Sequence, residues 1–172
     1  MKTILSCSFA VLFLATALFA DPTTGRVVNF SVRAEVVTKP VIQGLVVNGT
    51  QVILIRAVGT GLSQFGVSGV LSDPQIVLYD AAGHPVGRSK SVSSLTAAEY
   101  ALLVDASTKC GAFPLDRNSS DAVILYPLSG PNTFHLRSIS TAQGEVLFEA
   151  YAVPYAEFDP TTRIIDLIYM DL

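Results

Sequence analysis

From residue 27 onward, short apolar segments alternate with clusters of turn-forming residues, at a spacing of about ten residues. Over residues 27–37 polar side chains alternate with apolar ones, which are those of Phe30, Val32, Ala34 and Val36. This period of two is typical of a β-strand that buries one face and exposes the other. The repetition of such segments along the chain predicts a mainly β fold.

Asn48-Gly49 stands between two apolar segments, residues 41–47 and 51–58. Both positions of this dipeptide accept a positive φ, so Asn-Gly predicts a tight hairpin turn between two strands. In the second segment both alternating faces are apolar, which indicates a strand at the centre of a sheet. Pro131-Asn132 predicts another turn. The remaining strands are expected over residues 75–80, 122–128, 133–140, 145–153 and 163–169.

One segment departs from the β pattern. Apolar residues recur at helical spacing between residues 95 and 106. Thr96 and Glu99 have the spacing of a capping box, and Gly111 is suited to end a helix. These residues predict one short helix, whereas the glycine-rich residues 59–69 predict a loop.

The expected architecture is all-β, a β-sandwich or jelly-roll-like fold with one short helix. A chain of 172 residues is too short for two full-sized domains, so residues 21–172 are expected to form one domain. Its core is expected over about residues 27–153, followed by a C-terminal strand or tail over residues 160–172. That last segment is too apolar for a free tail, so it either pairs with the sheet or is buried by a partner.

The first twenty residues have the organisation of a secretory signal peptide. Lys2 is followed by an apolar stretch without charge, which ends at Asp21. We expect cleavage after Ala20 or after Ala17, although the stretch is also at the lower limit of length for a retained membrane anchor. Cleavage predicts a protein outside the cytoplasm, in the periplasm, at the cell surface or extracellular, with no membrane segment in the mature chain.

The charge and the cysteine content exclude several classes of protein. The formal net charge is −3 and only 15% of the residues are charged, which provides no electrostatic reason to bind nucleic acid. Loss of Cys7 with the signal peptide would leave Cys110 as the single thiol, so no disulfide could form within the chain. We expect Cys110 to be buried, with pairing between chains as the alternative.

The residues that could support catalysis are few and scattered. His84 lies in a Gly-Pro turn and His135 on an expected strand, and neither has a partner at the spacing of a metal site. Glu145 and Glu149 fall on one face of a strand, about 13 Å apart, which is too far for the carboxylate pair of a glycosidase. Both carboxylates are expected to face solvent.

A calcium loop is the other chemistry that the sequence could suggest. Asp116 and Asp121 flank Asn118-Ser119-Ser120, but their spacing does not match the alternating oxygen ligands of a defined calcium loop. We therefore expect no metal and no cofactor, and we expect the protein not to be an enzyme.

Three segments resemble a module of exported proteins from bacteria of the Verrucomicrobia type. The first covers residues 52–80, with Arg-Ala-Val-Gly, Phe-Gly-Val, Asp-Pro-Gln and Tyr-Asp in that order. The second is Cys110-Gly-Ala-Phe-Pro-Leu115, and the third is Gly144-Glu-Val-Leu-Phe-Glu-Ala-Tyr151. The resemblance spans about residues 28–153. It implies a β-rich domain of surface or secreted proteins with a structural or adhesive role, and it supplies no catalytic residue.

The sequence thus predicts an exported, non-enzymatic β-module with a structural or adhesive role at the cell surface or outside the cell. The alternative is a carbohydrate- or polymer-binding accessory module of a secreted hydrolase system. Partners would be other surface proteins or polysaccharide. The residues expected to contact a ligand or partner are Tyr100, Tyr126, Tyr155, Ile164 and Tyr169.

Overall fold

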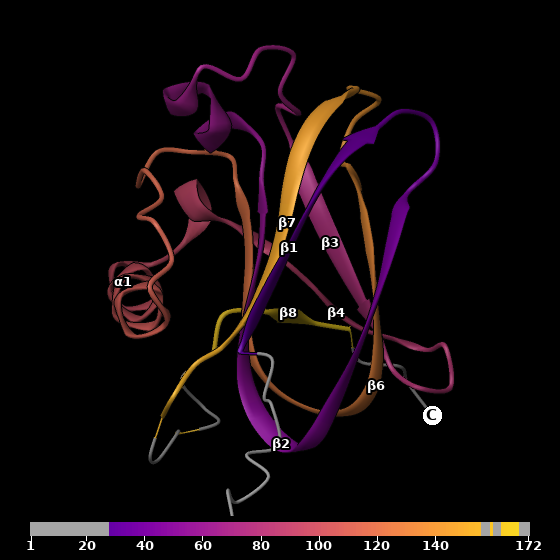
Figure 1. The fold of residues 1–172 in the computed structure, drawn as a ribbon, viewed down its shortest axis with the longest axis vertical. Helices are drawn as coiled ribbons and strands as arrows, with labels where there is room; N and C mark the ends of the chain where they lie inside the picture. The colour runs from indigo at the N-terminus through magenta and orange to yellow at the C-terminus, as the bar shows by residue number, and fades with distance from the viewer. Residues whose placement is uncertain (1–27, 156–158, 160–162, 169–172) are drawn as a thin grey trace, which may run out of the picture.

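The computed structural model describes residues 28–155, 159 and 163–168. This part of the chain is mostly β-strand with one α-helix, and its strands form an open antiparallel sheet in the order β1-β7-β2-β6-β3-β4-β8, with β5 paired to β6 (Figure 1). The prediction of a mainly β chain with one helix is confirmed. The strands are β1 (Asn29–Val36), β2 (Val41–Val58), β3 (Pro74–Tyr79), β4 (Pro85–Arg88), β5 (Lys90–Ser91), β6 (Ala122–Ser138), β7 (Gly144–Ala152) and β8 (Asp166–Leu167).

β2 and β6 are long strands that pair with each other along nearly their whole length. The prediction of a hairpin at Asn48-Gly49 is wrong, because β2 continues through this dipeptide. Val47 lies opposite Gly130 and Thr50 lies opposite Ser129, so the two intervening residues form a β-bulge. Gly49 has the positive φ of 70° that the dipeptide allows, but here it bends a strand and does not reverse it.

The expected turn at Pro131-Asn132 is also wrong, because β6 is continuous there. Gly130, next to this dipeptide, has a φ of 62°, and the Asn132 side-chain amide donates to the carbonyls of Ser129 and Gly130 at 3.2 and 2.9 Å. Both sets of turn residues therefore lie side by side at one corner, where the β2–β6 ribbon bends. On one side of the corner, residues 53–58 of β2 pair with β7 on their second edge. On the other side, residues 133–138 of β6 pair with β3.

The bent sheet has two faces, and each carries its own apolar cluster. The face inside the bend contains Ile55 of β2, with Phe134 and Phe148 in ring contact at 5.6 Å. The other face contains Leu54 and is covered by the single helix, which lies on the outer side of the sheet (Figure 1). The prediction that both faces of the segment around Leu54 are apolar because the strand is central is confirmed, since β2 lies between β7 and β6.

The helix α1 (Ala97–Cys110) has the boundaries that its end residues predict. Thr96 accepts from the Glu99 amide at 3.2 Å, and the Glu99 carboxylate accepts from the Thr96 amide at 2.8 Å. Gly111 ends the helix with a left-handed φ of 72°. The expected loop over residues 59–69 begins with a short 3-10 helix instead, η1 (Thr60–Phe65), and a second such turn, η2 (Val92–Ser94), precedes α1.

The C-terminal segment rejoins the sheet. Asp166 pairs with Arg88, so β8 lies on the free edge of β4, and Ile164 forms an isolated bridge with Leu125. The expected signal peptide at residues 1–20 lies outside the described residues. No helix in the described part of the chain has the length and apolarity needed to cross a membrane.

Candidate functional site

The tyrosines expected to contact a ligand do not form one surface. Tyr100 and Tyr155 both pack beside α1, whereas Tyr126 packs against the apolar cluster inside the bend of the sheet. The Tyr100 hydroxyl donates to the Leu115 carbonyl at 3.1 Å. The Tyr155 hydroxyl donates to the Asp105 carboxylate at 3.1 Å, and burial raises the pKa of this phenol. These rings serve packing and internal hydrogen bonds, so they offer no flat aromatic platform.

The two C-terminal residues expected to contact a partner have different outcomes. Ile164 is completely buried in the cluster under α1, where its amide and carbonyl exchange hydrogen bonds with Leu125. It therefore stabilises the chain's own core and is not available at the surface. Tyr169 lies outside the described residues.

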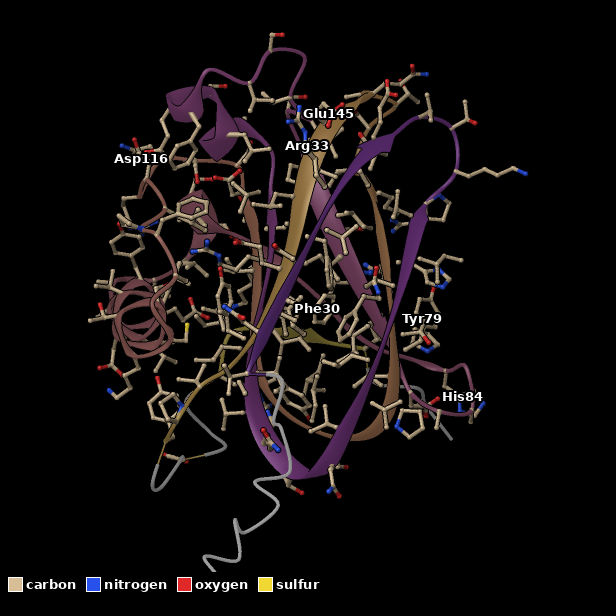
Figure 2. The ribbon with its side chains drawn as sticks, viewed as in Figure 1. Phe30, Arg33, Tyr79, His84, Asp116 and Glu145 are labelled. Carbon is tan, nitrogen blue, oxygen red and sulfur yellow. The ribbon has the colours of Figure 1, made fainter. Side chains whose placement is uncertain are left out.

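His84 is distant from the loop that carries Asp116. Figure 2 places His84 and Asp116 at opposite sides of the molecule. His84 lies in an exposed turn, with its Nδ1 3.5 Å from Oδ2 of Asp80. His135 stacks on Tyr79, with ring centroids 4.3 Å apart. No group of three or more His, Cys, Asp or Glu side chains in the described residues is arranged to hold a metal ion.

Glu149 does not face solvent, so that expectation is wrong. It lies on β7 directly opposite Arg56 of β2, and the side chains of both are almost completely buried. The Arg56 guanidinium donates from Nε and Nη2 to one Glu149 oxygen, at 2.9 and 2.5 Å, and from Nη1 to the Phe113 carbonyl at 2.6 Å. The Tyr151 hydroxyl donates to the other Glu149 oxygen at 2.6 Å.

This buried network joins the sheet to the loop that follows α1. The Arg56 guanidinium lies 4.3 Å above the Phe113 ring, which closes the network from the helix side. Burial, followed by the hydrogen bond to Glu149, raises the pKa of Tyr151, so the phenol remains protonated as a donor. The charged groups satisfy one another away from water, and the hydrogen bond to the Phe113 carbonyl connects the sheet to the loop after α1.

Cys110 lies beside this network at the end of α1. It is a free thiol of intermediate exposure, and its Sγ donates to the Ser107 carbonyl at 3.6 Å. Burial is the largest influence on its pKa, which is raised. A raised pKa lowers the fraction of reactive thiolate, so the environment does not activate Cys110 as a nucleophile.

Asp121, considered above for a calcium loop, is fully buried and caps η1. Its Oδ1 accepts from the amides of Gly59 and Gly61, at 2.8 and 3.1 Å, and from the Thr60 hydroxyl at 3.2 Å. A Cβ at Gly61 would lie 2.5 Å from the other carboxylate oxygen, so only glycine fits this close approach. The carboxylate therefore satisfies the start of η1.

An open hollow of ≈ 620 Å³ lies next to this cap, between η1 and the loop after α1. Its lining combines polar side chains with apolar surface, and its members are Thr60, Gly61, Gln64, Pro114, Leu115, Asp116, Asn118, Ser119 and Ser120. No aromatic side chain lines it. Its hydroxyl, amide and carboxylate groups could hydrogen bond to a polar ligand such as a sugar, without the stacking surface that sugar-binding sites commonly add.

A second accessible feature is the free edge of the sheet at β1. β1 pairs with β7 on one side and has no strand on its other side among the described residues. The first half of β2 likewise pairs only with β6, so two free edges flank the opening of the bent sheet (Figure 1). Apolar side chains of both edges, including Phe30 and Leu45, are only partly buried against the inner cluster.

The outer face of β1 carries charged residues, and one is engaged with β7. Arg33 Nε donates to the Glu145 carboxylate at 2.8 Å, with 58% and 32% of the two side chains exposed. Figure 2 shows both side chains close together on the outside of β1 and β7. Sequence reasoning predicted the alternation of β1 but not its position at an edge, which depends on pairing with a strand more than one hundred residues away. Unpaired edges of this kind are templates for another strand.

Comparison with known proteins identifies no relative of this chain. No protein-family model, no curated protein and no solved structure matches it. The resemblance to a module of exported bacterial proteins therefore remains a prediction from the sequence.

Proposed function

We propose that this chain is an exported, non-enzymatic β-module with a structural or adhesive role at the cell surface or outside the cell. In this proposal it acts by strand addition, in which the free edge of β1 pairs with a strand of a partner. The observation that carries the proposal is that β1 ends the sheet with its second edge unpaired in the described chain. Backbone hydrogen bonds would supply the affinity, and alternating side chains would supply the specificity.

Three further features support this proposal. The apolar segment at residues 1–20 has the pattern of an export signal. The Arg56–Glu149 network and the Asp121 cap engage these buried charged groups in hydrogen bonds within the chain. The bend of the β2–β6 ribbon around an apolar cluster supports a sandwich-like module, in which the two halves of each long strand contribute to opposing layers.

A proline at Ser31 tests strand addition. The Ala152 amide donates to the Val28 carbonyl, so the even-numbered residues of β1 bond to β7 and the Ser31 amide points away from it. Ser31→Pro therefore removes a donor from the free edge and leaves the ladder with β7 intact. Ser31→Ala is the matched control, because it removes the hydroxyl and keeps the amide. Val32→Lys is a second blocking variant, since an inward-pointing charge on an edge strand opposes pairing.

The measurement is the distribution of the full chain among the cytoplasm, the cell surface and the medium of the producing cells. We expect wild type and Ser31→Ala in the surface fraction, and both blocking variants in the medium. Thermal unfolding of the secreted variants checks that they fold. Retention of both folded blocking variants at the surface would contradict strand addition, and accumulation of wild type in the cytoplasm would contradict export.

The hollow between η1 and the loop after α1 favours a second function, binding of a carbohydrate polymer. Gln64 and Asn118 line the hollow with side-chain amides that could hydrogen bond to sugar hydroxyls. We would test co-sedimentation of the full chain with insoluble cellulose, chitin and xylan. Binding that Gln64→Ala and Asn118→Ala weaken, and that Gln43→Ala on β2 does not, would support this function. Absence of binding to all three polymers would remove its support.

A further inference from the structure

The free edge of β1 has a definite set of outward backbone groups. The Ala152 amide donates to the Val28 carbonyl at 2.8 Å, which fixes the phase of the antiparallel ladder between β7 and β1. Because hydrogen-bonded and non-hydrogen-bonded pairs alternate, the even-numbered residues of β1 point their amides and carbonyls toward β7. The outward groups therefore belong to Asn29, Ser31, Arg33 and Glu35.

The charges on the outer face of β1 are unbalanced in a single chain. Glu35 lies directly opposite Glu145 in the β1–β7 register, and like charges in this position destabilise a sheet. Arg33 forms an ion pair with Glu145. Glu35 has no ion-pair or hydrogen-bond partner for its side chain among the described residues. A cation opposite Glu35 on its free side would offset the repulsion between Glu35 and Glu145.

We propose that the strand added to β1 is β1 of a second copy, paired antiparallel about a two-fold axis at Ala34. This inference rests on the proposed function and names its partner. In this register Arg33 of each copy lies directly opposite Glu35 of the other, so two ion pairs form across the axis. Both residues have outward backbone groups, so they also form the hydrogen-bonded pairs of the new ladder.

Neighbouring registers with the same backbone phase lack this complementarity. A two-fold axis at Arg33 would place Arg33 opposite Arg33 of the second copy. An axis at Val32 would place Arg33 opposite Ser31 and Glu35 opposite Asn29, so neither charge would meet an opposite charge. The free edge of β2 has no comparable charges, since its exposed side chains include Ile42 and Val46. Self-complementary charge therefore favours β1 with β1 at a single register.

Charge reversal tests the partner and the register together. The full chain is purified with Cys7→Ser and Cys110→Ser, and its mass is measured over a range of concentrations by sedimentation equilibrium. We expect a monomer–dimer equilibrium for the wild-type chain. The dissociation constant of the dimer should be at least about tenfold higher for Arg33→Glu and for Glu35→Arg, because each variant places like charges across the axis. The double variant Arg33→Glu/Glu35→Arg restores the dimer.

Mixing the two single variants provides an internal control for folding. Arg33→Glu carries two acidic residues at these positions and Glu35→Arg carries two basic ones, so an equimolar mixture should form a heterodimer when neither variant dimerises alone. Dimers that persist in both single variants would overturn the proposed interface, as would a mixture and a double variant that remain monomeric.

A cysteine on the proposed axis tests the register independently. Opposing residues in a non-hydrogen-bonded pair have Cα atoms about 4.5 Å apart, which a disulfide can bridge. In the background without native cysteines, Ala34→Cys should form an intermolecular disulfide on oxidation. Val32→Cys is the control, because the register places it opposite Val36.

Equal cross-linking of the two variants, or none at Ala34→Cys, would overturn the register. A wild-type chain that stays monomeric at every concentration would overturn self-pairing. If the same chain still loses surface retention with Ser31→Pro, strand addition stands with a different partner. If Ser31→Pro has no effect either, the proposed function fails as well.

Discussion

The two glutamates on the outer face of β7 form the same kind of cross-strand contact in opposite environments. Glu149 pairs with Arg56 beneath α1, where both side chains are buried. Glu145 pairs with Arg33 at the edge of the sheet, where both side chains are exposed to solvent. The arginine–carboxylate chemistry is the same, and the covering layer differs. This comparison separates a part of the sheet that stabilises the fold from a part that remains available for binding.

Removal of Arg56 is expected to have the largest effect on stability. Arg56→Ala leaves the Glu149 carboxylate buried without its cation, which should lower the free energy of unfolding by about 3–5 kcal/mol. Urea unfolding followed by circular dichroism measures this change. Glu149→Gln should also destabilise the chain, because it removes the negative charge that neutralises Arg56. A loss of less than about 1 kcal/mol in both variants would show that the network does not hold the two layers together.

The Asp121 cap should have the next largest effect. Asp121→Ala removes the acceptor of three donors at the start of η1, and it should lower the free energy of unfolding by about 1–3 kcal/mol. Asp116→Ala is the matched control, because this residue is exposed and its carboxylate accepts a hydrogen bond from the nearby Asn118 backbone amide. Equal losses for the two aspartates in the same urea titration would contradict a specific role for the cap.

The bulge at Gly49 connects the covered half of β2 to its free half. Gly49→Ala should cost about 1–2 kcal/mol, because alanine disfavours the left-handed φ of this residue. The surroundings offer no steric clash, since no atom lies within 4 Å of an added Cβ at Gly49 or at Gly44 of the same strand. Gly44→Ala has no positive φ to maintain and should change thermal stability by less than about 0.5 kcal/mol. Equal losses of stability in Gly49→Ala and Gly44→Ala would contradict a role for the left-handed φ of Gly49.

The exposed ion pair should have the smallest effect on stability. Arg33→Ala should lower the free energy of unfolding by less than about 1 kcal/mol in dilute protein, because solvent screens the pair. The same variant should weaken self-association, which sedimentation at higher concentration measures. Destabilisation by Arg33→Ala comparable with that of Arg56→Ala would remove the distinction between the two parts of the sheet.

The sequence predicts local features of this fold well. The capping box at Thr96 and Glu99 and the terminating Gly111 need only neighbouring residues, so the boundaries of α1 follow from the sequence. The alternation along β1 likewise follows from local pattern. The Asn48-Gly49 dipeptide also indicates the correct backbone conformation, a positive φ at Gly49. Whether that conformation reverses or bends a strand depends on pairing with β6, which the local pattern does not contain.

The candidate site was less accessible to sequence reasoning, because it depends on which part of a face is covered. Alternation places Glu145 and Glu149 on one face of β7, but only the packing of the loop after α1 buries Glu149. Tyr100 and Tyr155 were expected at the surface, and their hydroxyls bond within the chain. The signal that could have identified the buried pair was an isolated arginine, Arg56, within an otherwise apolar central strand.

Amide hydrogen exchange along β1, measured by NMR at low and high protein concentration, tests the central claim most directly. In dilute protein we expect alternation, with slow exchange at Phe30, Val32 and Ala34 and fast exchange at Ser31, Arg33 and Glu35. At high concentration the fast amides should become protected in wild type and remain fast in Arg33→Glu. Protection of those amides at every concentration would show that the edge is covered within one chain. Fast exchange at every concentration would show that no second copy binds it.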